Sequence, residues 1–181
     1  MVSEALFEAA YMRSNRPFLK QKLRLYFDEN FPVEVIRYFA SSSFWRKKLK
    51  IVSARGEKNL GQSDFFHYAH CMRKSYTLVT LDSGFNDDRR HPFASGQMAG
   101  IIIINVISSD HPGILLALSH FLEFLLVLPF PKAFMFETKV VAGHDGVIMR
   151  GRDVLTREIK SLRVIAGETS LLEVRNFFNY W

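Results

Sequence analysis

Three aspartates that lie far apart in the sequence each border an apolar segment. Asp28 follows the apolar run in LRLYFDENFP, Asp82 follows TLVTL, and Asp64 begins the amphipathic segment DFFHYAHCMRK. Carboxylates that lie close together raise one another's pKa, and a divalent cation removes that penalty. Ligand sets made only of oxygen favour Mg²⁺ or Mn²⁺ over zinc. If the three side chains converge, we expect a metal site that binds a phosphodiester oxygen and lowers the pKa of an attacking water.

The polar segment after Asp82 adds further candidates. Asp87 is a candidate fourth metal ligand, with Asp88 beside it. The segment spans residues 83–98, and connections of that length are usually functional or disordered. Hydroxyl and guanidinium groups in or next to the segment can contact phosphates. The candidates for RNA binding are Thr80, Ser83, Arg89 and Arg90.

Each aspartate also has an interpretation that involves no chemistry. Asp28 can form an Asx turn before a helix, Asp64 can cap a helix, and Asp82 precedes Ser-Gly, a common turn pair. Asp87 and Asp88 can be solvated loop charges. The metal hypothesis therefore depends on several acids reaching one place and not on any single acid.

The elements that must position these acids alternate between strand and helix. Apolar runs predict strands at residues 23–27, 50–54, 77–81 and 100–106, and helical spacing predicts helices from about 32, over 63–74 and over 112–127. We expect the block SSSFWRKK to break or end the first helix. The order predicts a three-layer α/β/α sandwich with a mainly parallel sheet and helices on both faces. GIIIINV is the most apolar strand and should lie centrally, and acids after the strands should share the carboxyl edge of the sheet.

Both ends of the chain carry additions to this unit. Residues 1–20 read as an N-terminal helical extension, and residues 21–150 as the α/β domain. Gly143 to Gly146 separate two strand patterns, which predicts a C-terminal β-hairpin. Residues 151–181 form a C-terminal extension, in which Ser170 and Glu173 have capping-box spacing before a terminal helix. Aromatic residues in that helix favour core or homodimer packing over base stacking.

The composition suits a basic cytoplasmic protein. The 181 residues are 48% hydrophobic and carry 24 Lys and Arg against 18 Asp and Glu, a net charge of +6 that favours polyanions such as nucleic acid. A single cysteine, Cys71, excludes an internal disulfide and is expected to be a buried structural thiol in a reducing compartment. His67 and His70 lack a third ligand at suitable spacing, so we expect one in the core and one at the surface. No apolar stretch is long enough to span a bilayer, so we expect no membrane partner.

Four segments in this order, LYFDENFP, GQSDFFHYAH, TLVTLDSGF and GIIIINV, resemble the PIN-like family whose members open with an Asp-Glu-Asn-Leu-Pro type motif. That family belongs to the PIN ribonuclease superfamily, many of whose members are toxins of toxin–antitoxin pairs. The resemblance covers roughly residues 22–150. It implies an acidic site of Asp28, Asp64 and Asp82 that binds Mg²⁺ or Mn²⁺, endoribonuclease activity, RNA as substrate and a cognate antitoxin as a partner.

Two of the motifs depart from the family pattern. Gly84 stands where the family commonly has a second aspartate of Asp-x-Asp-Phe, and Phe65 and Phe66 follow Asp64 where relatives are often acidic. Both departures favour an alternative function, a catalytically degenerate PIN-like fold that binds RNA or a protein. A nucleotide-binding module is a weaker third hypothesis, because the sequence has neither Gly-x-x-x-x-Gly-Lys-Ser/Thr nor Gly-x-Gly-x-x-Gly.

Overall fold

The strands expected from the sequence form one mixed sheet in the computed structural model. The structure describes residues 22–93, 100–106, 110–127, 138–143, 146–152, 156 and 158–164. The strands are β1 (Leu23–Phe27), β2 (Leu49–Ser53), β3 (Thr77–Thr80), β4 (Ile101–Ile104), β5 (Thr138–Gly143), β6 (Gly146–Arg152) and β7 (Ile159–Val164). The helices of the described residues are α2 (Val33–Ser41), α3 (Ser43–Lys48), α4 (Asp64–Lys74) and α5 (His111–Val127), with a 3₁₀ turn η1 (Ser83–Asn86).

The sheet is parallel over its first five strands. Its order is β2-β1-β3-β4-β5-β6-β7, in which β6 and β7 are antiparallel additions. β4 lies at the centre, as its sequence predicted, and all four of its isoleucines are buried. Ile102 pairs in register with Val79 of β3 and with Val140 of β5. A strand covered on both faces has no polar side, which explains the uninterrupted apolar run.

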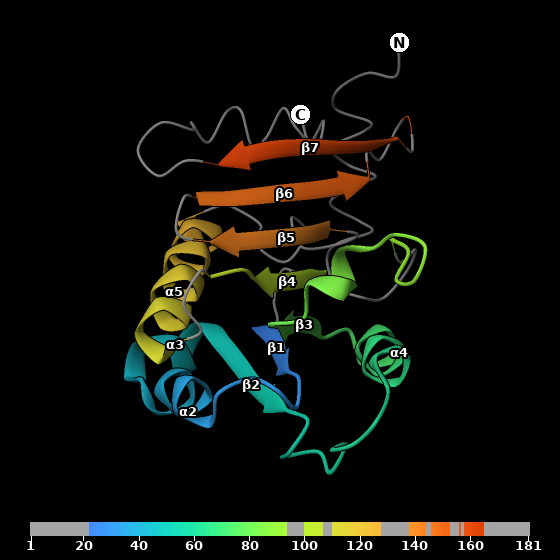
Figure 1. The fold of residues 1–181 in the computed structure, drawn as a ribbon. Coiled ribbons are helices and arrows are strands. Elements are labelled where there is room, and N and C mark those ends of the chain that lie inside the picture. Colours follow the sequence, from blue (N-terminus) through green and yellow to red (C-terminus); the bar gives the residue numbers. More distant parts are fainter. Residues whose placement is uncertain are drawn as a thin grey trace, which may run out of the picture.

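Helices lie on both faces of the sheet, which confirms the expected layering (Figure 1). α2, α3 and α5 cover one face, and α4 covers the other. Side chains alternate along β1, so Leu25 and Phe27 enter the core beneath the three helices and Tyr26 enters the core beneath α4. Cys71 of α4 lies in the second core as a free, fully buried thiol, and burial raises its pKa well above the ordinary value. This confirms the structural role predicted for Cys71.

The block SSSFWRKK forms a helix of its own, whereas the sequence predicted only the end of α2. Ser42 has extended backbone angles and ends α2, and its side chain then accepts a hydrogen bond of 3.4 Å from the backbone N–H of Trp45. Trp45 is 3% exposed and packs against Phe39. Serine capping and the burial of one large indole therefore continue the chain as α3.

The C-terminal hairpin is present, and the sheet continues beyond it. Gly143 and Gly146 lie opposite each other between β5 and β6, as expected. β7 was not predicted, because its apolar residues do not all follow its alternating burial: Ile159 is 46% exposed, whereas Lys160 is partly buried. It pairs with β6 along its whole length, so the sheet crosses the boundary expected at residue 150. The expected helices at residues 1–20 and after Ser170 lie outside the described residues.

None of the helices that the structure describes combines the length and the apolar character needed to cross a bilayer.

Candidate functional site

The strand order places two of the predicted acids at a topological switch point. β2 lies on one side of β1 and β3 lies on the other, and ligands of open parallel sheets bind beyond the carboxyl ends of strands at such a point. Asp28 directly follows β1, and its N–H donates to the Val79 carbonyl of β3 over 3.1 Å. Asp82 follows β3 after Leu81. The two carboxylates that the sequence placed at strand ends are therefore neighbours across β1 and β3.

The Asp28 side chain is buried and only half satisfied. It is 6% exposed, and its Oδ2 accepts a short hydrogen bond from the Thr80 hydroxyl, whereas its Oδ1 is buried without a partner. Burial raises the pKa of Asp28 to about 6, with a smaller contribution from the Asp82 charge, against the hydrogen bonds from Thr80 and the Asn30 backbone. A buried carboxylate oxygen without a donor is energetically costly, which makes it a candidate ligand atom.

Thr80 joins the two acids from within the sheet. Its hydroxyl donates to Asp28 and accepts from the backbone N–H of Asp82 over 2.9 Å. The sequence suggested that Thr80 touches RNA, but the residue is fully buried and its hydroxyl orients the two acids instead. Asp82 caps η1, because its Oδ1 accepts from the Gly84 N–H over 2.7 Å. Ser83, the other hydroxyl candidate, is exposed.

Asp64 begins α4, and its carboxylate pairs with Arg90 and not with the site of Asp28 and Asp82. Ser63 is the helix cap, since its hydroxyl accepts from the Phe66 N–H over 3.2 Å, so Asp64 is not needed for that role. The Asp64 carboxylate lies 3.6 Å from the guanidinium of Arg90, and both side chains are about half exposed. An arginine thus compensates the charge of the third acid at this edge.

Arg90 also lies beside the position of the missing aspartate. A Cβ built on Gly84 would meet Asp82 Oδ1 at 3.0 Å and Arg90 Nη1 at 3.4 Å. The guanidinium therefore borders both Asp64 and the turn that Asp82 caps. Among the described residues no group of three or more His, Cys, Asp or Glu side chains is arranged to hold a metal ion. The structure brings together Asp28 and Asp82, and it pairs Asp64 with Arg90.

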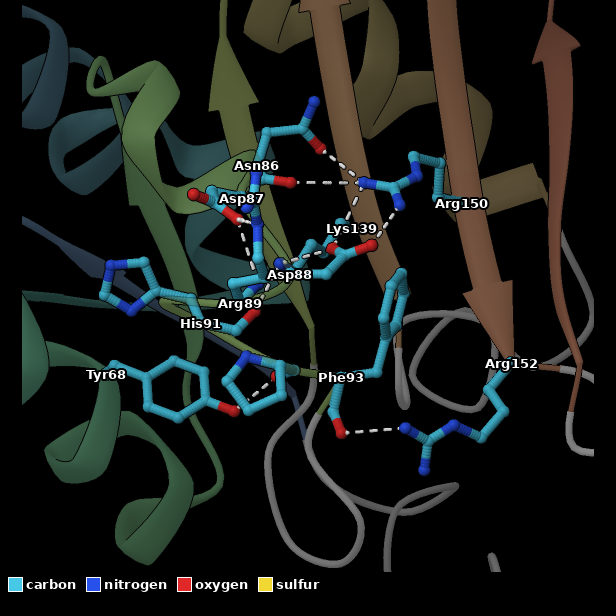
Figure 2. A network of polar contacts seen from close by, with 11 residues as sticks. Tyr68, Asn86, Asp87, Asp88, Arg89, His91, Phe93, Lys139, Arg150 and Arg152 are labelled. Carbon is cyan, nitrogen blue, oxygen red and sulfur yellow. Dashed lines mark hydrogen bonds and ion pairs between the residues drawn. The ribbon is translucent and has the colours of Figure 1, made fainter.

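The other charged candidates of the polar segment have separate partners. The Asp87 carboxylate accepts from the Arg89 backbone N–H over 2.9 Å and lies 3.8 Å from the Arg89 side chain, which is 96% exposed. Asp88 is bound by two cations from the C-terminal hairpin, as Figure 2 shows: Lys139 at 2.9 Å and Arg150 in a two-pronged contact. Burial opposes the charge of Asp88, but these bonds outweigh it and hold its pKa below the ordinary value.

The Asp88 contacts fasten the segment after β3 to the sheet. Arg150 of β6 also donates to the Asn86 side chain over 2.9 Å, and Lys139 of β5 donates to the His91 carbonyl (Figure 2). Lys139 is 1% exposed. Sequence reasoning missed both cations, because a lysine and an arginine in a hairpin suggest solvated positions. Their role is to hold Arg90 and its neighbours against the sheet.

Three histidines near this edge lie inside the protein. His67 accepts or donates a hydrogen bond of 3.0 Å with the Tyr26 hydroxyl, and His70 pairs with Glu57. Both are buried, so the expectation that one lies at the surface is wrong. His91 stacks on Phe85 with ring centroids 4.4 Å apart, and burial lowers its pKa.

Comparison with known proteins gives no relative from which a role can be transferred. No protein-family model matches the chain, and no curated protein or solved structure gives a significant match.

Proposed function

We propose that this protein is a metal-dependent endoribonuclease of the PIN-like type, in which Asp28 and Asp82 hold Mg²⁺ or Mn²⁺. The observation that carries the proposal is the buried Asp28 carboxylate, which has one oxygen without a partner and lies beside Asp82 at the switch point of the sheet. The resemblance of the motifs around both acids extends the proposal to the toxin of a toxin–antitoxin pair, with an antitoxin protein as partner, in the cytoplasm.

The residues present fit such a cation. Two neighbouring acids, one of them deprived of water, are stabilised by a divalent charge. Mg²⁺ commonly uses only one or two carboxylates and leaves its other positions to water and substrate phosphates, so the pairing of Asp64 with Arg90 does not prevent binding. When bound, the cation supplies Lewis-acid activation of water and of the phosphodiester.

The side chains around the acids have defined tasks in this proposal. Thr80 fixes the orientation of Asp28, and the Gly84 N–H fixes that of Asp82. Arg90 has an exposed guanidinium beside Asp64 and the turn that Asp82 caps, and it can bind the phosphate that precedes or follows the scissile bond. The net charge of +6 favours a polyanionic substrate over a neutral one.

RNA cleavage in Mn²⁺ tests the assignment. We expect Asp28→Asn and Asp82→Asn to abolish cleavage, and Thr80→Val to reduce it by about 10- to 100-fold, as is usual for residues that orient ligands. Asp87→Asn is the matched control, since its carboxylate pairs with Arg89 and, among the described residues, shows no contact with Asp28 or Asp82. Equal cleavage by the wild type and by Asp82→Asn would refute the proposed site.

A second function, RNA binding without cleavage, is favoured by one feature of the site. Gly84 removes a carboxylate from the turn after β3, and the cation that borders the gap is Arg90. Calorimetric titration separates the two functions. If Mn²⁺ does not bind at millimolar concentration while RNA still binds, the protein is a binding module and not a nuclease.

A further inference from the structure

We propose that Phe65 is a base-stacking platform that positions the RNA strand next to the acids of the candidate site. The inference rests on the proposed function in taking RNA as the ligand. It is carried by the exposure of one aromatic ring, by the charged groups beside it and by the different use that the chain makes of its neighbour, Phe66.

Phe65 is the most exposed of the large hydrophobic side chains described, at 68%. It lies in the first turn of α4, directly after Asp64, whose carboxylate is 3.6 Å from Arg90. Exposing a phenyl ring to water forgoes the stabilisation that its burial would give. A single exposed ring is ordinary by itself, so the inference depends on the charged pair that begins one residue before it, Asp64 with Arg90.

Phe66 shows that an aromatic ring in this turn can be used internally. Its ring stacks on His70 at 5.8 Å with an interplanar angle of 12° and contacts His67 edge-on. Packing of α4 therefore requires Phe66 and leaves Phe65 without a described role in the fold. Of two adjacent phenylalanines, one supports the helix and the other faces solvent at the edge that carries the acids.

Phe65 and the arginine that pairs with the preceding residue match the two parts of a nucleotide, its base and its phosphate. Arg90 is 61% exposed at its side chain, can pair with a phosphate and borders the turn that Asp82 caps. An aromatic ring beside a phosphate-binding cation is the arrangement with which proteins hold unpaired nucleotides, because every base has a face that stacks. Bases within a duplex are not open to such a ring, so we expect unpaired RNA to be preferred.

Phe44 offers a matched control. It is also an exposed phenylalanine, at 51%. It belongs to α3, on the face of the sheet opposite to α4 (Figure 1), and the Lys48 ammonium lies over its ring. If RNA binds to any exposed aromatic ring with a basic residue nearby, alanine at either position should weaken binding. A loss confined to Phe65 identifies the edge that carries the acids.

Fluorescence anisotropy with a short labelled single-stranded RNA in EDTA tests the inference without any dependence on cleavage. We expect Phe65→Ala to weaken binding by roughly 5- to 100-fold, the usual effect of removing one stacking ring. Phe65→Trp should retain the wild-type affinity, Phe44→Ala should leave it unchanged, and the same RNA in a duplex should bind more weakly. Wild-type affinity of Phe65→Ala, equal affinity for duplex, or no binding of either RNA by the wild type overturns the inference.

The outcome is separable from that of the proposed nuclease. If no RNA is cleaved but single-stranded RNA binds through Phe65, the nuclease assignment fails and the platform stands. If Asp82 is required for cleavage while Phe65→Ala binds and cleaves as the wild type does, the platform fails and the nuclease stands.

Discussion

Replacing Asp28 by asparagine should make the stability of the protein less sensitive to pH. Burial raises the pKa of Asp28 to about 6 in the folded protein, from 3.8 for a solvated aspartate. Between these values the folded state holds more protons than the unfolded state, so the free energy of unfolding falls as the pH rises and is constant above the window. The difference corresponds to about 2.4 kcal/mol lost between pH 4 and pH 7.5.

Asparagine lacks this ionisation, and its other effects do not vary with pH. Its carbonyl can accept the hydrogen bond from Thr80, while its amide takes the place of the unpartnered Oδ1 at a cost of about 1–3 kcal/mol. We therefore expect the unfolding free energy of Asp28→Asn, relative to the wild type, to increase by about 2.4 kcal/mol between pH 4 and pH 7.5. Urea denaturation in EDTA, followed by circular dichroism at several pH values, measures it.

Two controls make this result specific. Asp87→Asn removes a carboxylate that is 40% exposed, and its relative stability should change much less over the same range. Added Mn²⁺ should stabilise the wild type but not Asp28→Asn, because the cation binds only the folded site. A relative stability of Asp28→Asn that stays flat from pH 4 to pH 7.5 would show that Asp28 is not desolvated, and the physical basis of the metal site would fail.

Three further substitutions test the surroundings of the site. Asp88→Asn should destabilise the fold by about 3 kcal/mol in urea denaturation, because it leaves the 1%-exposed Lys139 without its counter-charge; a change below about 0.5 kcal/mol, typical of surface positions, would contradict this. Glu57→Gln should cost about 1–3 kcal/mol in the same assay by breaking the pair with the buried His70, and wild-type stability would show that the pair is not needed. Gly84→Asp should raise Mn²⁺ affinity at least about tenfold in calorimetry, because it adds a carboxylate to the turn after β3. Gly84→Ala adds only the Cβ and should not raise it. Equal Mn²⁺ affinities of Gly84→Asp and the wild type would count against a metal at this turn.

Some features could be predicted because they depend only on neighbours in the sequence. The four isoleucines of β4 identify a strand covered on both faces, and Ser63 identifies the start of α4. The short helix α3 was missed although its cap is also local, because SSSFWRKK has the composition of a break. β7 was missed because its apolar residues do not all follow its alternating burial, with Ile159 exposed and Lys160 partly buried.

Other features depend on partners that the sequence does not pair. Lys139 is buried although lysine is ordinarily exposed, because Asp88 and a backbone carbonyl meet it from a segment about fifty residues away. Thr80 was expected to face RNA, but the strand order turns it toward Asp28. Periodicity shows which side chains share a face, and it does not show which segment lies opposite.

The sequence by itself determined the alternation of strands and helices and the placing of acids after two parallel strands, because hydrophobic periodicity and capping act over a few residues. Only the tertiary structure decided that β1 and β3 are neighbours, so that Asp28 and Asp82 share a switch point while Asp64 pairs with Arg90. Strand order and ion pairing are long-range choices, fixed by how whole elements pack. That packing also sets how strongly the Asp28 carboxylate is desolvated. The proposed chemistry depends on this desolvation.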